Sequence, residues 1–370
     1  MNILCLDVET TIFQKGNSHS QANRMVVGGY LFNGVYREYY LDDLSSHVII
    51  WMISNCDLLI TFAGKFDLNW LRRSHGIQYH KQIWDVQLAH FIITNQEEPY
   101  PSLNSVCEYY GLGQKEDAVK TFWDQGIGTE AIPRPILSGY LEQDVRLTYE
   151  CYLKQKDCAQ KRLILQSGWD MLTLAEMEFN GMQYDCEASL AEAEIVQAQI
   201  DDMDKMLAEE VECEINWSSP TQVSKVLYGG VISLKTTESY LLHYKDDKKL
   251  PVTKVRTVKH DISFPRLVNP LKSHGDESYS IDEGTLKKLK PTGKAKRIIV
   301  IIQERAKLAK TIGTYLRGMP KKNSDYGWPE NMIHGSFNSC VAVTGRLSSS
   351  APNLQNVDSV VKPFFTTRFA

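Results

Sequence analysis

The sequence predicts an α/β domain with a central sheet, followed by a mainly helical region with a β-rich insertion. Three observations predict this order. The first 150 residues alternate apolar runs of strand length with stretches of helical spacing. From about Gln166 the spacing becomes helical over long stretches. Between about Gly229 and Ser280, β-branched residues with interspersed lysines replace this spacing, which favours an inserted β-hairpin or loop.

The expected elements of the first domain are bounded by their own residue patterns. Gly111 is a stop signal for one of the expected helices, and Pro133 and Pro135 precede another. Apolar or aromatic runs typical of strands occupy Ile3–Val8, Met25–Leu31, Val35–Leu41 and Leu58–Phe62. Helical spacing covers Phe66–Leu71, Asp85–Ile93, Ser102–Tyr110 and Ile136–Lys154.

The later region is expected to be a series of helices. Ser189 can cap the longest of them, which continues to about Val211 and is rich in Asp and Glu. Pro220 follows two serines and suits the first turn of a short helix, where no N–H partner is needed. The other expected helices are Trp169–Phe179, Asp282–Leu289 and Lys294–Arg317.

The composition limits the class of protein. A chain of 370 residues exceeds one ordinary core, so two or three domains are expected, and 43% hydrophobic with 23% charged residues is typical of globular proteins. No apolar run reaches the roughly 20 residues that span a bilayer, and the N-terminus lacks the features of a signal peptide. The eight cysteines are scattered without a C-x-x-C pair, which indicates a reduced, cytoplasmic setting and no zinc site.

The net charge of −4 hides a strongly basic stretch. Between Lys287 and Lys322 the chain carries twelve basic residues and one acid, Glu304. A solvated helix face is one interpretation. Contact with a phosphate backbone is the other, and we favour it because such a charge excess repels itself unless anions lie nearby. The candidate DNA contacts on the expected helix are Lys294, Arg297, Arg305, Lys307 and Lys310.

Two acidic residues share one face of the first expected strand. Asp7 and Glu9 are two residues apart, so both side chains leave the sheet on the same side. Two such carboxylates repel each other unless a cation or water lies between them, and Mg²⁺ or Mn²⁺ prefers oxygen ligands. An edge strand with solvated acids carries the same pattern, so the pair alone does not decide between the two interpretations.

Further residues fit the same chemistry. Asp67 follows a strand at the start of a helix, and Tyr140 and Asp144 are one helical turn apart. Two-metal hydrolysis of a phosphodiester needs carboxylates to hold the ions and a group to orient the water. Taken singly, Asp67 also suits a helix N-terminus, and the Tyr–Asp pair also suits an exposed helix face. Asp85, at the head of another helix, is either a supporting acid or a helix cap.

The order of these motifs resembles that of the DnaQ-like, DEDDy-type exonucleases, which have an RNase H-like fold. The resemblance covers about residues 1–165. It implies 3′→5′ cleavage of single-stranded DNA by two Mg²⁺ or Mn²⁺ ions. One position departs from the pattern, because relatives usually have an Asn where this sequence has Ala63, which removes an expected substrate contact but no metal ligand. The implied ligands are Asp7, Glu9, Asp67 and Asp144, with Tyr140 beside the nucleophile.

A second resemblance lies near the C-terminus. The stretch TGRLSSSAPNLQN, residues 344–356, is rich in polar and turn residues. It closely resembles the T-G-R-L-S-S-x-x-P-N-L-Q-N stretch of family A DNA polymerases, the bacterial polymerase I and phage replicative type. The resemblance implies that the chain binds primer–template DNA as well as a single-stranded 3′ end. The implied contacts to the minor groove are Arg346, Asn353, Gln355 and Asn356.

The segment between these motifs resembles the thumb of the same family. Residues 178–181 and 217–222 are similar to the start of a thumb, and the basic helix is similar to its DNA-gripping part. The resemblance implies an exonuclease domain at 1–165, a thumb at 166–325 with an insertion at about 229–280, and the N-terminal part of a palm at 326–370. In some relatives such an insertion docks a processivity factor, so a partner there is possible.

The catalytic palm acids and the fingers helix of the family would follow this stretch, and these 370 residues do not include them. We therefore expect no polymerase activity from this chain alone. The leading hypothesis is the proofreading half of a split, phage-type polymerase in the (host) cytoplasm, completed by a second polypeptide with the remaining palm and fingers. The alternatives are a non-catalytic DNA-binding scaffold with a weakened nuclease, and a free-standing exonuclease.

Overall fold

The computed structural model of the chain describes residues 1–41, 46–113, 118–242, 252–271, 273–274 and 278–367. These form two compact units: Met1–Ser189 together with Gly318–Ala370, and Leu190–Arg317. The expected insertion includes residues 243–251, 272 and 275–277, and the expected palm segment includes 368–370, all of which lie outside the described residues. The expected division into exonuclease, thumb and palm stays a prediction.

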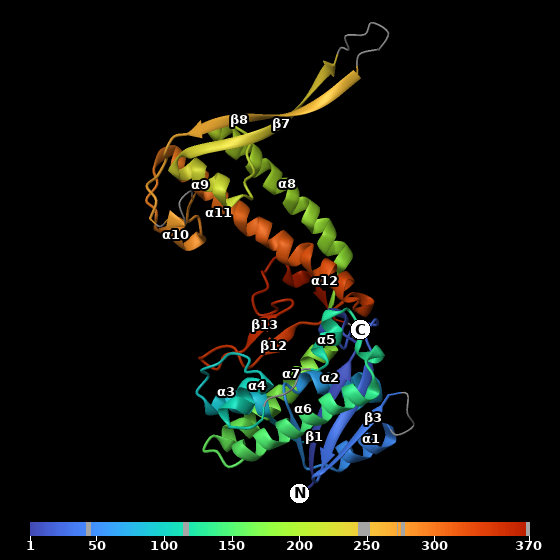
Figure 1. The fold of residues 1–370 in the computed structure, drawn as a ribbon. Helices are drawn as coiled ribbons and strands as arrows, with labels where there is room; N and C mark the ends of the chain where they lie inside the picture. Colours follow the sequence, from blue (N-terminus) through green and yellow to red (C-terminus); the bar gives the residue numbers. More distant parts are fainter. Residues whose placement is uncertain (42–45, 114–117, 243–251, 272, 275–277, 368–370) are drawn as a thin grey trace. The chain divides into compact units, whose positions relative to one another are not determined.

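The first unit is built on a mixed five-stranded sheet with the order β3-β2-β1-β4-β5 (Figure 1). The central strand β1 pairs antiparallel with β2 and parallel with β4. The expected α/β domain with a central sheet is confirmed, whereas the short strand β5 was not expected. The strands are β1 Ile3–Thr10, β2 Met25–Phe32, β3 Val35–Tyr40, β4 Leu58–Thr61 and β5 Gln82–Asp85.

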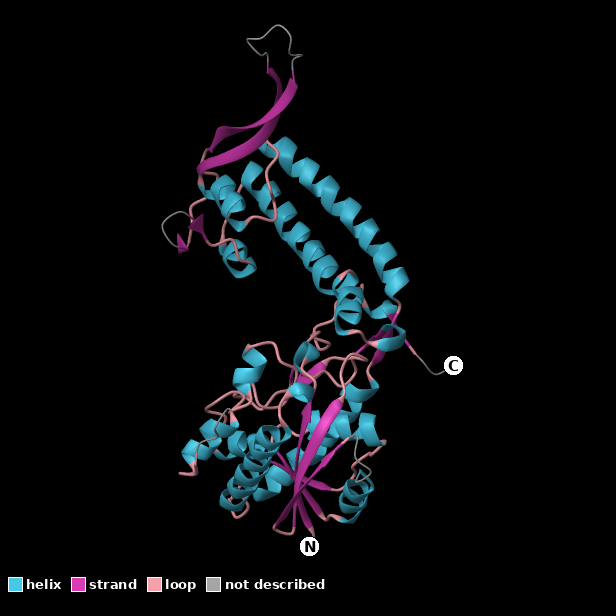
Figure 2. Ribbon diagram, turned by 45° about the vertical axis from the view of Figure 1, so that its right-hand side comes forward, coloured by secondary structure: helices cyan, strands magenta, loops and turns pink. Residues whose placement is uncertain are grey.

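Helices cover both faces of this sheet (Figure 2), because alternate residues of β1 are buried on opposite sides. Leu4, Leu6 and Val8 pack in a core with α1, α2 and α7. Cys5 packs in a second core with α3, α4 and α6, and Asp7 and Glu9 continue its row. The helices are α1 Ser46–Asn55, α2 Lys65–His75, α3 Val86–Ile93, α4 Leu103–Tyr109, α5 Lys120–Asp124, α6 Arg134–Gln155 and α7 Lys161–Asn180.

The C-terminal part of the first unit adds short strands. β6 pairs with β11 on one side and β14 on the other, and β12 pairs with β13. Among the described residues, no helix combines the length and the apolar character needed to cross a bilayer. The added elements are β6 Met182–Tyr184, α12 Gly318–Tyr326, β11 Met332–Ile333, β12 Ser336–Asn338, β13 Ser348–Ser350 and β14 Phe365–Thr366.

The second unit contains two long helices and a β-hairpin. β7 and β8, each 13 residues long, pair antiparallel, so the expected hairpin within the insertion is observed. The expected helix 294–317 is α11 followed by a π-helical turn at Ile312–Leu316. The elements are α8 Cys186–Val211, α9 Pro220–Tyr228, β7 Gly230–Leu242, β8 Val252–Phe264, β9 Ser273–His274, β10 Ser278–Tyr279, α10 Glu283–Lys288 and α11 Gly293–Thr311.

Helix starts agree with the sequence at Pro220, which opens α9, but not at Ser189. The expected cap at Ser189 is wrong, because α8 begins three residues earlier, at Cys186. Asp185 takes the capping position, and its Oδ1 accepts a hydrogen bond from the N–H of Ala188 at 2.9 Å. Aspartate caps helices as well as serine does, and Asp185 comes first along the chain.

Candidate metal centre and nucleic-acid interface

Strand β1 and helix α6 bring three carboxylates together. Asp7 and Glu9 lie on the face of β1 that packs against α6, and Asp144 is a buried residue of α6. One ligand oxygen from each of the three lies within 4.8 Å of the other two. Oxygens that bind one divalent cation are roughly 3 to 5 Å apart. The three residues could therefore hold a metal ion, and a donor set of oxygens alone suits Mg²⁺ or Mn²⁺.

The close approach of α6 to β1 depends on a glycine in the neighbouring strand. Gly29 of β2 is the register partner of Asp7. A Cβ built on Gly29 would lie 2.6 Å from Cγ of Leu141, a fully buried residue of α6. Any side chain at this position would push α6 outward, and Asp144 with it. The small size of Gly29 therefore lets the acids of strand and helix meet.

Asp67 lies against the backbone of β1, beside the cluster. β4 pairs with β1 only as far as Cys5, and beyond this point Asp67 Oδ1 accepts a hydrogen bond from the N–H of Val8 at 3.2 Å. The side chain is 1% exposed. Burial, followed by the charge of Asp7, raises the pKa of Asp67 well above its usual value. A cation nearby would relieve the repulsion between Asp67 and Asp7. Asp67 therefore fits a fourth ligand, although the group whose ligand atoms lie within 4.8 Å of one another does not include it.

Asp85 anchors the turn that precedes Asp67. Its Oδ1 accepts a hydrogen bond from the N–H of Leu88 at 2.8 Å, so it caps α3. Its Oδ2 accepts from the N–H of Gly64 at 2.7 Å and from the hydroxyl of Thr61 at 3.2 Å. Both carboxylate oxygens are thus bonded within the protein. Of the two expected roles of Asp85, the helix cap is confirmed. Asp85 supports the site by fixing the position of this turn.

The backbone of the same turn is strained at Ala63, where φ is 54°. A left-handed conformation costs a residue with a Cβ about 1 kcal/mol, and Gly or Asn tolerates it better. We expect Ala63→Gly to raise the free energy of unfolding by about 1 kcal/mol in urea denaturation, and Ala63→Asn to raise it less. Ala191→Gly, in the exposed helical backbone of α8, should instead lower it by about 1 kcal/mol. A lower free energy of unfolding in Ala63→Gly would contradict the backbone strain at Ala63.

Tyr140 lies on α6 one turn before Asp144, as the spacing predicts. Its ring is 9% exposed and packs edge-on against Trp123, with ring centroids 6.2 Å apart. This contact holds the ring of Tyr140 in place on the side of α6 that faces the sheet. Its expected role beside an attacking water stays a prediction.

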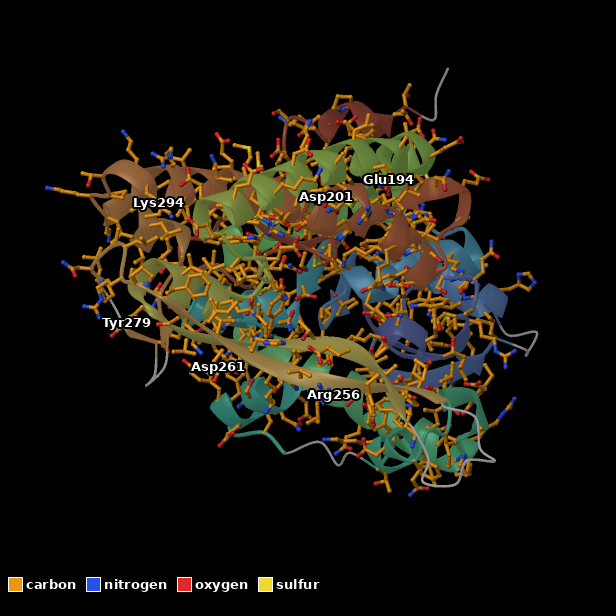
Figure 3. All side chains as sticks on the ribbon, turned by 90° about the horizontal axis from the view of Figure 1, so that it is seen from above. Glu194, Asp201, Arg256, Asp261, Tyr279 and Lys294 are labelled. Atoms are coloured by element: carbon orange, nitrogen blue, oxygen red, sulfur yellow. The ribbon has the colours of Figure 1, made fainter. Side chains whose placement is uncertain are left out.

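Two arginines of α11 pair with acids of α8; Figure 3 labels Lys294 of α11 and Glu194 and Asp201 of α8. Arg297 donates to both carboxylate oxygens of Glu210, at 2.6 and 3.1 Å. Arg305, whose side chain is 11% exposed, forms an ion pair with Asp204. Both arginines therefore join α11 to the acidic helix α8. Of the five residues expected to contact DNA, Lys294, Arg297, Lys307 and Lys310 are exposed, and the expected contacts of all five stay predictions.

The stretch 344–356 forms a surface loop around β13. Asn353 Oδ1 accepts hydrogen bonds from the N–H groups of Gln355 at 3.0 Å and Asn356 at 3.3 Å, so this side chain shapes the turn. Arg346, Gln355 and Asn356 are exposed. The loop thus exposes a guanidinium and two side-chain amides, while the side-chain carbonyl of Asn353 accepts local hydrogen bonds.

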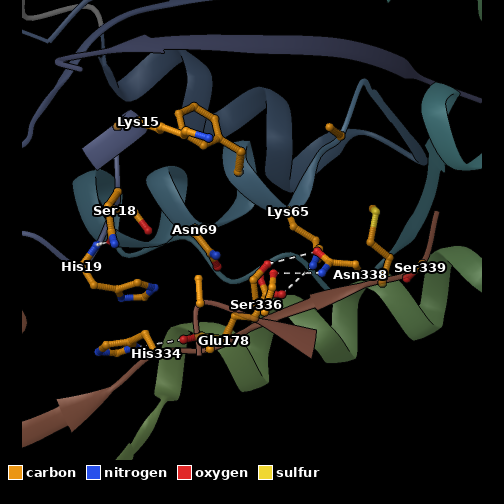
Figure 4. Close-up of a pocket in the computed structure, with 18 of the residues that line it drawn as sticks. Lys15, Ser18, His19, Lys65, Asn69, Glu178, His334, Ser336, Asn338 and Ser339 are labelled. Carbon is orange, nitrogen blue, oxygen red and sulfur yellow. Dashed lines mark hydrogen bonds and ion pairs between the residues drawn. The ribbon is translucent and has the colours of Figure 1, made fainter. Parts of the chain in front are cut away.

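A separate cavity of about 540 Å³ lies within the first unit (Figure 4). The loop after β1, the start of α2, helix α7 and residues 326–351 supply its walls. Lys65 Nζ contacts Glu178 Oε1 at 2.5 Å, and the same oxygen accepts from the N–H of Phe337 at 2.6 Å. These contacts join the turn before Asp67 to α7 and β12. No sequence signal indicated this cavity, because its walls come from distant segments.

His19 and His334 stack in the wall of this cavity, with ring centroids 3.7 Å apart. Burial, together with the charge of His334, lowers the pKa of His19 from 6.5 to about 3. The unfolded chain therefore takes up this proton at higher pH than the folded chain, so stability is lost as the pH falls below 6.5.

We expect His19 to account for a loss of about 2 kcal/mol of unfolding free energy between pH 7 and pH 5. Urea denaturation at several pH values measures it. His19→Gln should flatten the pH dependence. Equal slopes for His19→Gln and the unaltered protein would contradict the assignment.

The geometry defines a mixed α/β protein with a candidate site for a divalent cation and, in a second unit, a helix with exposed lysines. Comparison with known proteins then gives its relationship. A family model described as DNA polymerase family A matches residues 260–367. The chain is related to the family A DNA polymerases.

Two curated relatives cover most of the chain. The DNA polymerase I of Synechocystis sp. is 28% identical over 303 residues, which is 80% of this chain and 26% of that protein. The DNA polymerase of Bacillus phage SP01 is 24% identical over 321 residues, 80% of this chain and 33% of that protein. The chain therefore spans about a quarter to a third of the length of these relatives.

Among solved structures, the fold resembles the POL domain of Pol1 from M. smegmatis, which was determined in complex with DNA primer–template and dNTP. The TM-score is 0.63 at 17% sequence identity, and the match covers 96% of this chain and 52% of that chain. The likeness is one of fold, and the matched structure is described as a polymerase domain.

Proposed function

We propose that this chain is the 3′→5′ exonuclease and DNA-binding portion of a family A DNA polymerase. The observation that carries the proposal is the cluster of Asp7, Glu9 and Asp144, with the buried Asp67 beside it. The sheet order β3-β2-β1-β4-β5, with the acids on its central strand, supports an RNase H-like nuclease domain. The relationship to DNA polymerases supports DNA as the substrate.

The proposed roles follow from the position of each residue. Asp7, Glu9 and Asp144 hold the metal, and Asp67 adds a fourth carboxylate for a second ion. Bound Mg²⁺ or Mn²⁺ would polarise the scissile phosphate and lower the pKa of the attacking water. Tyr140, fixed by Trp123, orients that water from α6. The metal ligands are held in place by the Gly29 contact and by the turn that Asp85 anchors.

The proposed DNA contacts lie on exposed surfaces. In the second unit, Lys294, Lys307 and Lys310 contact phosphates through their exposed side chains, which adds affinity that depends on salt but not on sequence. Arg297 and Arg305 hold the supporting helix pair together. In the first unit, Arg346 and the amides of residues 353, 355 and 356 contact the primer–template minor groove.

The proposal is tested with the purified chain, Mg²⁺ and a single strand labelled at its 5′ end. We expect stepwise shortening from the 3′ end, which stops in excess EDTA. A strand labelled at its 3′ end should release the label at once as a mononucleotide. A mismatched primer end should be removed faster than a paired one. No shortening in Mg²⁺ or Mn²⁺ would overturn the proposal.

A second candidate is a DNA-binding scaffold without nuclease activity. Ala63, in place of the Asn of the exonuclease pattern, favours it, and the solved structure that the fold resembles is described as a polymerase domain. The scaffold would bind primer–template DNA in the shortening assay but leave it intact. The four acids and Tyr140 favour the nuclease over this scaffold. A free-standing exonuclease, the remaining alternative, would shorten DNA without any partner.

Polymerisation by a complex with a second polypeptide, which would carry the remaining palm and fingers, is part of the same proposal. Mixing this chain with a separately expressed palm–fingers polypeptide should give a complex in size exclusion and primer extension that neither part shows alone. Absence of both results would overturn the split arrangement. A processivity factor at the β7–β8 hairpin and a cytoplasmic location stay predictions.

A further inference from the structure

The cavity of about 540 Å³ in the first unit has the size of a small-ligand site and is separate from the metal ligands. It lies next to them, because its wall includes Ala63, Lys65 and Phe66, the residues that lead to Asp67. Its two lining carboxylates are already bonded within the protein, Asp85 to the turn and α3, and Glu178 to Lys65 and β12. The cavity therefore presents no carboxylate that lacks a hydrogen-bond partner.

One buried amide in this cavity lacks a partner. Asn69 is 8% exposed, and its side chain makes no hydrogen bond among the described residues. Figure 4 shows it projecting from α2 across the cavity toward Ser336 and Glu178. Both the donor and the acceptor of this amide are therefore available to a ligand in the cavity. The Nε1–H of Trp328, another lining residue 5% exposed, also has no acceptor among the described residues.

The rest of the wall suits a flat aromatic ligand. The rings of Phe66, Tyr100 and Trp328 line the cavity together with the stacked pair of His19 and His334. Aromatic rings stack on nucleobases whatever the base. An Asn amide pairs with the hydrogen-bonding edge of a base through one donor and one acceptor. Lys15, an exposed lining residue, supplies a cation for a phosphate.

We propose that this cavity binds an unpaired nucleobase that carries a phosphate, with Asn69 pairing to the edge of the base and Lys15 contacting the phosphate. The base comes either from a single strand led past the nuclease carboxylates or from a free nucleoside monophosphate. The inference rests on the proposed function only where a DNA strand is the source of the base. A base held here would keep an unpaired strand next to the turn that carries Asp67.

The test is equilibrium binding in EDTA, where no cleavage takes place. The probes are dAMP, deoxyribose 5-phosphate and a fluorescein-labelled single strand of about ten nucleotides. We expect dAMP to bind more tightly than deoxyribose 5-phosphate. Asn69→Leu, which keeps the size of the side chain, should weaken dAMP and the strand about tenfold, the effect of roughly 1.4 kcal/mol. Gln78→Leu removes an exposed amide outside the cavity and should change neither affinity.

The outcomes distinguish a DNA strand from a free nucleotide as the source of the base. They also distinguish failure of this inference from failure of the proposed function. Weakening of the strand alone supports a strand site, and weakening of dAMP alone supports a free-nucleotide site. Unchanged binding of both by Asn69→Leu and by a second variant, Asn69→Ser, overturns the inference, as does equal binding of dAMP and deoxyribose 5-phosphate. Unfolding in urea checks that the variants are folded. Asn69-dependent binding in a protein that shows no nuclease activity would refute the proposed function alone.

Discussion

Replacing Asp7 by Asn is expected to lower the rate of metal-dependent 3′-end removal by a factor of about 10³ or more, equivalent to about 4 kcal/mol. The variant keeps the shape of the side chain but removes one anionic oxygen ligand from a group whose ligand atoms lie within 4.8 Å of one another. A quenched-flow or gel assay on a 5′-labelled strand at saturating DNA measures the rate.

The same variant separates a metal site from a chance group of acids. In EDTA, Asp7→Asn should be more stable than the unaltered protein, because Asp67 and Glu9 then face one charge fewer. Mg²⁺ should raise the melting temperature of the unaltered protein and raise that of the variant less. Asp170→Asn, on an exposed position of α7, should alter neither rate nor metal response. An unchanged rate in Asp7→Asn would refute the assignment of the cluster.

The acids of the site could be predicted from the sequence because each pair depends on local geometry. A strand places Asp7 and Glu9 on one face, and a helical turn places Tyr140 above Asp144. Whether these acids come together depends on contacts between distant segments. One example is the close packing of Gly29, which has no side chain, against α6. No local sequence pattern indicates such a contact. The short strand β5 was missed for a similar reason, since its four residues carry too little periodicity.

The basic helix shows what a charge pattern leaves undecided. The sequence marks Arg297 and Arg305 as cations but not their neighbours, and the partners Glu210 and Asp204 lie 87 and 101 residues away along the chain. The acidic composition of α8 was the available signal, because two long helices of opposite charge favour pairing. The cavity around Asn69 had no such signal, since loop, helix and C-terminal strands each supply a few of its residues.

Gly29→Ala is expected to destabilise the fold by about 1 to 3 kcal/mol and to lower the exonuclease rate about 10²-fold. The new methyl would lie 2.6 Å from Cγ and 2.9 Å from Cδ2 of Leu141, so α6 has to move away from β2. Asp144 lies one turn further along α6 and would move away from Asp7 with it. Urea denaturation and the 5′-labelled strand assay measure the two effects.

A double-mutant cycle decides whether this contact sets the position of the site. Leu141→Ala alone should cost about 2 to 5 kcal/mol through the cavity it leaves. In Gly29→Ala/Leu141→Ala the added methyl occupies part of that space, so the double variant should lose less stability than the sum of the single variants and should recover activity relative to Gly29→Ala. Gly139→Ala is the matched control, because a Cβ there meets nothing within 4 Å and should stabilise α6 by about 0.5 to 1 kcal/mol. Additive losses with no recovered activity would mean that α6 reaches its place without Gly29.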